Sequence, residues 1–391
     1  MKTLHLSPTD PAFVQDPYPF YDAARRDAPV QYWEDYAMLA AFDAGTVQAL
    51  FRDRRLGREP LVPRSYGPHM ADWVALERHS MLELEPPRHT RLRGLVLRAF
   101  TSRRIAALRP DIEEITRHLL DDLPATPVDL IPAFCTQLPV RIIARLLGVP
   151  EEMWRELLAW SNTMVAMYQT GRTRAVEDAA NAAAAAFAAF LRAYVDNRRN
   201  DPGDDLITHL IAAEEDGEKL TTDELIATVV LLLNAGHEAT VHSLGNAVKC
   251  LLEHATAPAA LAPENIAPTV EELLRFDPPL HMFTRFAYED IALGDVTLKR
   301  GDEIALVLGA AGRDPNLYER PNIFDPFRPA KPHAAFGGGL HFCVGAPLAR
   351  LELQVALPAL FAHVPAMQLA ETPRYANSYH FHKLDRLMVA P

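Results

Sequence analysis

The chain has 391 residues, of which 49% are hydrophobic and 23% are charged, a balance typical of a globular protein with a large buried core and not of a disordered one. The formal net charge of -12 would repel a phosphate backbone, so the composition argues against nucleic-acid binding. Three cysteines, Cys135, Cys250 and Cys343, lie far apart, which excludes a disulfide scaffold and predicts a reducing compartment.

The amino-terminal residues 1–11 contain no apolar run long enough for a secretion signal. The longest alanine-rich run, residues 182–191, is about half the length that a membrane-spanning helix needs. We see no linker between separately folded halves, so we predict a single domain over residues 1–391. We expect it to be cytoplasmic, with no membrane anchor.

Helical patterns rich in glutamate, alanine and leucine dominate residues 88–277. Short strand-like pieces are separated by Asp, Gly and Pro and predict a minor sheet, at residues 37–42, 284–288, 291–299 and 304–308. The predicted fold is therefore mainly α with a minor β-sheet.

An arginine-rich segment opens the helical region. Between Arg88 and Arg109 the chain has seven arginines and no acidic residue. The segment either meets an anion or an acidic partner, or is the solvated flank of a helix, and the charge pattern alone favours neither.

A long helix is predicted to begin at Thr221, where Thr221 and Glu224 form a capping box ahead of an apolar run that continues to about Cys250. Such a helix has about 30 residues and a length of about 45 Å. Its centre, residues 234–240, combines small and polar residues. An acid in a core helix costs several kcal/mol unless it is paired, so Glu238 is either a functional residue or a salt-bridged core acid.

Proline is frequent in residues 314–332, which excludes a regular helix or a central strand there. The glycine-rich segment that follows carries Cys343, just ahead of a predicted helix start, where the helix dipole and backbone N–H groups favour the thiolate. A structural zinc site would need three further Cys or His ligands at short spacing, so zinc is disfavoured. A lone thiolate suits a metal whose other ligands come from elsewhere, such as the four nitrogens of a porphyrin. The alternative interpretation of this segment is a glycine-rich turn beside a buried cysteine.

Four positions in this segment, Phe336, Gly339, Cys343 and Gly345, have the spacing of a haem-binding signature, and with them the chain resembles the cytochrome P450 family. The resemblance implies the cytochrome P450 fold, haem b (iron protoporphyrin IX) as cofactor and Cys343 as the iron ligand. Electron donation from a thiolate to the iron favours O–O cleavage.

The centre of the long helix resembles the oxygen-activation motif of the family. Ala235, Gly236 and Glu238 match the small pair and the acid. Ala239, however, stands where the family has an alcohol that takes part in proton delivery, and Thr240 is displaced by about 100° round the helix. We predict that ordered water or a substrate hydroxyl substitutes, or that reductant is poorly coupled to product.

Residues 85–93 resemble the family's haem-propionate helix, which implies that His89 and Arg93 contact the propionates. Arg285 and His341 complete the implied set, because buried propionates favour arginine partners. For the two histidines, a solvated or a core hydrogen-bonding role is the alternative.

Residues 270–279 resemble the family's Glu-x-x-Arg helix, which implies a supporting charge network of Glu272, Arg275 and Arg328. The spacing alone is weak, since Glu85 and Arg88 share it; the order along the chain gives it weight. The resemblance also places the arginine-rich segment beside the haem, where a ferredoxin-type donor could dock.

The implied reaction inserts one oxygen atom from O2 into a small, largely apolar organic substrate, by hydroxylation or oxidative dealkylation. Electrons would come from a ferredoxin-type donor with its reductase. Two alternatives stay open: a peroxide-using or rearranging haem-thiolate enzyme, and a non-enzymatic haem sensor. Candidate pocket residues, which could equally be core, lie at 61–84, 164–168, 231–235, 280–283 and 380–382.

Overall fold

The computed structural model describes residues 1–168, 172–215, 218–378 and 381–391. The chain divides into two compact units. The first contains residues 1–61, 120–135 and 239–391, and the second contains residues 62–119 and 136–238. The single-domain organisation expected from the sequence stays a prediction.

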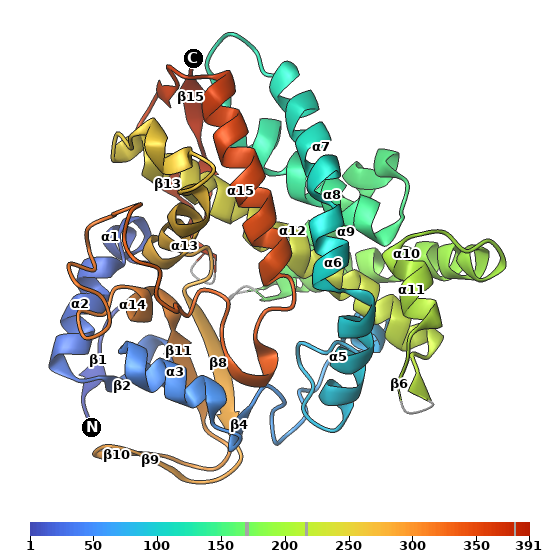
Figure 1. Ribbon diagram of the computed structural model, residues 1–391. Helices are drawn as coiled ribbons and strands as arrows, with labels where there is room; N and C mark the ends of the chain where they lie inside the picture. The colour runs from blue at the N-terminus through green and yellow to red at the C-terminus, as the bar shows by residue number, and fades with distance from the viewer. Residues whose placement is uncertain (169–171, 216–217, 379–380) are drawn as a thin grey trace. The chain divides into compact units, whose positions relative to one another are not determined.

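A six-stranded sheet forms the centre of the first unit, with the strand order β1-β2-β3-β11-β8-β4. Strand β11 pairs in parallel with β3, where Ile304 lies opposite Leu39, and antiparallel with β8, where Ile304 lies opposite Arg285. Figure 1 shows β8 and β11 beside α3 and α14. The strands are β1 (Thr3–Leu4), β2 (Val30–Trp33), β3 (Met38–Ala41), β4 (Leu56–Gly57), β8 (Met282–Ala287) and β11 (Glu303–Val307).

The side chains of β11 alternate between two apolar clusters, as the pleat of a strand requires. Ile304 and Leu306 belong to a cluster that includes residues of α3. Ala305 and Val307 belong to the other cluster, which includes aromatic residues of α1 and α2. The sheet is therefore buried on both faces. Helices of this unit are α1 (Pro11–Gln15), α2 (Tyr18–Asp27), α3 (Ala44–Arg52), α13 (Ile266–Phe276), α14 (Leu308–Gly312) and α15 (Ala346–His363).

Smaller sheets complete the first unit. The expectation of one strand piece over residues 291–299 is wrong, because Gly294, with a φ of +62°, turns the chain and divides it into a hairpin. The small sheets pair β9 (Ile291–Leu293) with β10 (Val296–Leu298), β13 (Arg374–Tyr375) with β14 (Leu384–Arg386), and β15 (Met388–Ala390) with both β12 (Gln368–Leu369) and β5 (Val128–Asp129).

The second unit is almost entirely helical. Its longest complete helix, α10, contains the alanine-rich run, and Phe187 and Leu191 are fully buried there. The elements are α4 (Ala71–Glu77), α5 (Arg88–Ala99), α6 (Ser102–Ala107), α8 (Gln137–Leu147), α9 (Trp154–Val165), α10 (Arg174–Asn200), α11 (Leu206–Ala212), β6 (Glu214–Glu215) and β7 (Glu218–Lys219). Helix α7 (Arg109–Asp121) begins in this unit and ends in the first.

Helix α12 (Thr222–Glu253) has 32 residues and belongs to both units. Its start has the predicted capping box: the Thr221 N–H donates to Glu224 Oε2 at 2.9 Å, and the Glu224 N–H donates to Thr221 Oγ1 at 3.2 Å. Among the described residues, α12 alone is long and apolar enough to cross a membrane, but 78% of that stretch is buried within the protein, as in a core helix. The prediction of a mainly α fold with a minor sheet is confirmed.

Candidate functional site

Cys343 lies in a tight loop three residues ahead of α15. The N–H of Cys343 donates to the carbonyl of Phe336 at 3.0 Å, and the N–H of Phe342 donates to the carbonyl of Gly339 at 3.2 Å. These bonds close the loop on itself and leave Cys343 exposed. The predicted position just before a helix start is confirmed, because α15 begins at Ala346.

The glycines of this loop are required by its close approach to the end of α3. Gly339 has a φ of +65°, and a Cβ there would lie 1.9 Å from the carbonyl oxygen of Phe51. A Cβ at Gly338 would lie 2.9 Å from the Phe51 Cβ. At Gly345, by contrast, a Cβ would be in ordinary contact with the Cys343 sulfur at 3.8 Å. Any side chain at residue 339 therefore forces α3 and the cysteine loop apart.

A second set of contacts, from Glu271 of α13, holds the loop from its other end. Arg350 of α15 donates twice to the Glu271 carboxylate, and its guanidinium lies 4.4 Å from the centre of the Phe336 ring. His333 Nε2 lies 3.1 Å from Glu271 Oε2. Burial raises the pKa of Glu271, but the hydrogen bonds from His333 and Arg350 outweigh it and lower the pKa to about 2. The carboxylate thus links two helices to the first residue of the loop.

Sequence reasoning assigned no role to Glu271, His333 or Arg350. A signal was present: Arg350 is one turn into the helix that follows Cys343, where a long side chain points back toward the preceding turn.

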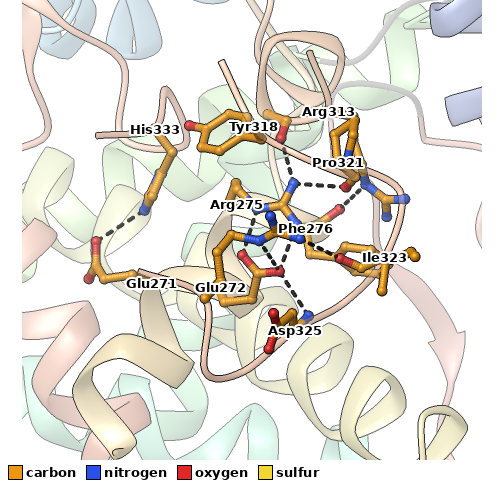
Figure 2. A network of polar contacts seen from close by, with 12 residues as sticks. Glu271, Glu272, Arg275, Phe276, Arg313, Tyr318, Pro321, Ile323, Asp325 and His333 are labelled. Atoms are coloured by element: carbon orange, nitrogen blue, oxygen red, sulfur yellow. Dashed lines mark hydrogen bonds and ion pairs between the residues drawn. The ribbon is translucent and has the colours of Figure 1, made fainter. Parts of the chain in front are cut away.

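The predicted network of Glu272, Arg275 and Arg328 is confirmed. Figure 2 shows Glu272 and Arg275 within it. Arg275 donates to both carboxylate oxygens of Glu272 at 2.6 and 2.7 Å, and Arg328 Nε donates to Oε1 at 3.1 Å. Arg275 also donates to the carbonyls of Gly312 and Pro321, at 2.7 and 3.0 Å. The network therefore fixes the backbone of the proline-rich segment, in which residues 314–332 contain neither helix nor strand, as predicted.

In the centre of α12, Glu238 is mostly buried, with 13% of its side chain exposed, and its Oε2 lies 3.7 Å from His237 Nε2. His237 Nδ1 bonds the carbonyl of Leu233 at 2.8 Å. Because a carbonyl only accepts, Nδ1 carries a proton and a second proton on Nε2 would face Glu238. The acid therefore has a titratable neighbour on its own helix.

The protein's own packing does not require glycine at residue 236, since a Cβ there would meet Ile143 at an ordinary 3.5 Å. Ala235 is exposed, whereas Thr240 is buried. A hydroxyl that sequence reasoning missed belongs to Ser243, whose Oγ donates to the Ala239 carbonyl at 2.9 Å. Ser243 is one turn beyond Ala239, so it lies on the same side of the helix.

The candidate propionate ligands are divided between the units. His89 is buried and Arg93 is half-buried, both on α5 in the second unit. In the first unit, Arg285 is buried on β8 with its guanidinium 5.1 Å from the centre of the Phe51 ring, and His341 is half-buried in a short 3-10 helix, Gly339–His341.

The arginine-rich segment is partly neutralised by acids from other parts of the chain. Arg91 pairs with Glu224, and Arg104 lies 3.3 Å from Asp204. Arg103 is exposed. The segment is therefore less cationic than its sequence suggests.

Among the candidate pocket residues, His281 and His382 are buried against tyrosines of α2 and β13. His380 lies outside the described residues. Met164 Sδ lies 3.9 Å from Asn234 Nδ2 in the second unit.

The donor set at Cys343 fits a haem iron. The described residues contain one group of three or more His, Cys, Asp or Glu side chains that could hold a metal, and Cys343 is not part of it. If the sulfur of Cys343 binds a metal, a cofactor must supply the other ligands, as a porphyrin does.

The family whose sequence model matches is described as Cytochrome P450, and the matches cover residues 140–265 and 266–364. A relative called cytochrome P450 107B1, from Saccharopolyspora erythraea, is 38% identical over 98% of this chain and 96% of its own length. The vitamin D(3) 25-hydroxylase of Pseudonocardia autotrophica is 39% identical over 92% of this chain and 89% of its own. Among solved structures, P450BioI in complex with a hexadec-9Z-enoic acid-ligated acyl carrier protein matches with a TM-score of 0.91 and 34% identity, over 97% of this chain and 99% of that one.

Proposed function

Because the chain belongs to the cytochrome P450 family and is therefore a haem-dependent monooxygenase, we propose that Cys343 is the protein ligand of its haem iron. The observation that carries this proposal is the exposed sulfur of Cys343 in a loop that hydrogen bonds close and that α3 and Glu271 brace. The haem, as haem b, would supply the iron at which O2 is activated.

Several residues have proposed roles around this ligand. Phe336 anchors the loop through Arg350, and Gly339 lets the backbone pass close to α3. Gly345 is assigned to the haem-binding loop by the family signature. His89 and Arg93, with Arg285 and His341, would bind the propionates; their support is the family resemblance and the chemistry of the side chains.

The helix α12 would face the oxygen. Ala235 and Gly236 offer a small surface, and Glu238, with His237 beside it, can hold and pass protons. Ala239 has no hydroxyl, although it stands where the family has an alcohol that takes part in proton delivery. We therefore propose that water or a substrate hydroxyl relays the proton there. Thr240, which is buried, is a weaker candidate for that role.

The substrate we propose is a small, largely apolar organic molecule that undergoes hydroxylation or oxidative dealkylation. An acyl chain on a carrier protein is a second candidate, because the solved structure at 34% identity was obtained with such a partner. Adding free fatty acids and carrier-bound acyl chains to a library and recording the spin-state shift of the haem would separate the two substrate classes.

We propose a ferredoxin-type donor with its reductase as the source of electrons, docking on the arginine-rich segment in a cytoplasmic setting. Changing the exposed Arg103 to Glu should then slow reduction of the haem at low salt and have little effect at high salt, because surface charge is screened. The control is Arg300→Glu, which changes net charge equally on an exposed arginine of the first unit. Equal slowing by both variants would argue against docking at Arg103.

The iron-ligand proposal is tested by the spectrum of the reduced, carbon-monoxide-bound protein. The red-shifted Soret band of a thiolate ligand should be present in the wild type and absent in Cys343→Ala. Its persistence in that variant, or its absence from the wild type, would refute the assignment. Turnover with peroxide alone, or binding without any oxygen-dependent product, would favour the peroxide-using enzyme or the haem sensor.

A further inference from the structure

We propose that Asp277, His281 and His382 form a second metal site, distinct from the cysteine loop, that binds a divalent ion such as Zn²⁺. All three residues are buried in the first unit, and one ligand atom from each lies within 4.8 Å of the others. Two imidazoles and a carboxylate are a donor set that zinc and related transition metals use in proteins.

The three side chains are held by the backbone of three different segments. Asp277 directly follows α13, and His281 follows the Pro278–Pro279 turn directly before β8. His382 lies between β13 and β14, where its N–H donates to the Pro279 carbonyl at 2.8 Å and its carbonyl accepts from Asn246 at 2.9 Å. The fold thus fixes the backbone positions of the three ligands.

One pair of the proposed ligand atoms has the spacing of a tetrahedral ion. Ligands at about 2.0 to 2.1 Å from zinc are separated from one another by about 3.3 to 3.4 Å. His382 Nε2 lies 3.4 Å from Asp277 Oδ1, and Tyr18 Oη lies 3.5 Å from His281 Nε2. Tyr18 donates to Asp277 Oδ1 at 2.6 Å and so orients the carboxylate, and a water would be the fourth ligand.

The three side chains have the chemistry that a metal site requires, because a carboxylate and imidazole nitrogens bind metals through their lone pairs. All three meet in one buried space.

A second layer of side chains orients these ligands, as in known metal sites. Tyr21 Oη lies 3.0 Å from His281 Nδ1 and helps to orient that ring. Tyr375 donates to Asp277 Oδ2 and stacks on the His382 ring, with the ring centres 3.6 Å apart. A Cβ at Gly309 would lie 3.0 Å from His281 Nδ1, so the glycine leaves room for the ring in this orientation.

Two cations near the cluster limit how tightly an ion is held. The Arg313 guanidinium lies 3.7 Å from the centre of the Tyr18 ring, and Lys249 Nζ lies 5.2 Å from the centre of the Tyr375 ring. Lys249 already offsets the charge of Asp277, so a dication meets repulsion and should bind reversibly. On the side of Tyr375 lies a surface hollow of about 600 Å³, which Tyr375 lines together with Glu371 and Asp385.

The test measures the metal content of the haem-loaded protein, with the haem iron as internal reference. Protein is stripped with a chelator, incubated with zinc chloride, separated from free metal by gel filtration and analysed by mass spectrometry. We expect one zinc per iron in the wild type and loss of that zinc in His382→Gln. His254→Gln, which alters a histidine of the same unit outside the cluster, should keep it. Equal zinc in His382→Gln and the wild type, or no zinc in the wild type, would overturn the site in favour of a metal-free hydrogen-bond network.

A second variant covers the case in which His382→Gln does not fold. Tyr375→Phe keeps the ring stack and removes one hydrogen bond to Asp277, so zinc affinity should fall by about 10-fold to 100-fold. Zinc-edge X-ray absorption should show imidazole and oxygen ligands, and a sulfur ligand would refute the assignment. The ligand set seen at the zinc edge does not depend on Cys343, so failure of this site leaves the haem-ligand proposal intact.

Discussion

The carboxylate of Glu271 offers a pH-dependent test of what stabilises the cysteine loop. In the folded protein its pKa is about 2, against an ordinary value of 4.5. A lowered folded-state pKa contributes stability that is present above the ordinary pKa and is lost as the pH falls through the folded value. The shift corresponds to about 3 kcal/mol, and because the Glu271 side chain is 24% exposed, solvent screening reduces the expected contribution to about 2 kcal/mol.

The perturbation is Glu271→Gln, which keeps the shape of the side chain and removes its charge. We expect the free energy of unfolding in urea to fall by about 2 kcal/mol at neutral pH, because Arg350 and His333 lose an ionised acceptor. The difference from wild type should shrink as the pH is lowered from about 4.5 toward 2, since the wild-type carboxylate is then protonated as well. Because Arg350 also lies over Phe336, the variant should show a larger fraction of carbon-monoxide complex without the thiolate Soret band.

The matched control is Glu371→Gln, which breaks an ion pair with the exposed Arg386. Exposed pairs contribute about 0 to 1 kcal/mol, so this variant should stay close to wild type at every pH. A Glu271→Gln difference that is constant from neutral to acidic pH, or no larger than that of the control, would refute the electrostatic reasoning.

Three further predictions address the supports of the site. Glu272→Gln should lower the free energy of unfolding by about 3 to 5 kcal/mol in urea titrations, because it leaves the buried charge of Arg275 without its partner; a loss below about 1 kcal/mol would contradict this. Gly339→Ala should abolish the thiolate Soret band, because its Cβ would overlap the Phe51 carbonyl. The control is Gly294→Ala, which is also at positive φ but would have no atom within 4 Å of its Cβ. It should keep the band and lower the free energy of unfolding by about 1 to 2 kcal/mol. Ala239→Thr should lower the hydrogen peroxide formed per reductant consumed, and tight wild-type coupling that the change does not alter would remove the poor-coupling hypothesis.

The features that could be predicted from sequence are those that local patterns encode. The capping box at Thr221 and Glu224 uses residues three apart, so the start of α12 follows from the sequence alone. The fold class follows from helical periodicity, and the position of Cys343 before α15 follows from the glycines and the proline around it. Strand β1 was missed, because two residues carry no recognisable alternation, and β2 was missed as well.

The missed features depend on residues that are distant in the chain. Arg91 belongs to an acid-free segment, yet its partner Glu224 comes from the start of α12. His281 and His382 were expected to line a pocket, and only the packing of α2, β8 and the β13–β14 hairpin reveals that they meet Asp277. Charge and histidine content in the sequence therefore indicate the type of chemistry, but not which side chains contact one another.

Part of the proline-rich segment is held through its backbone. Arg275, from α13, donates to the carbonyl of Pro321, and Arg328, from within the segment, donates to the carbonyl of Ile323; every residue type supplies a carbonyl. The side chains at positions 321 and 323 can thus change without loss of these hydrogen bonds, whereas the two arginines cannot. Evolution or a designer could vary that surface, for instance to accept a different electron donor, and leave the cysteine loop undisturbed.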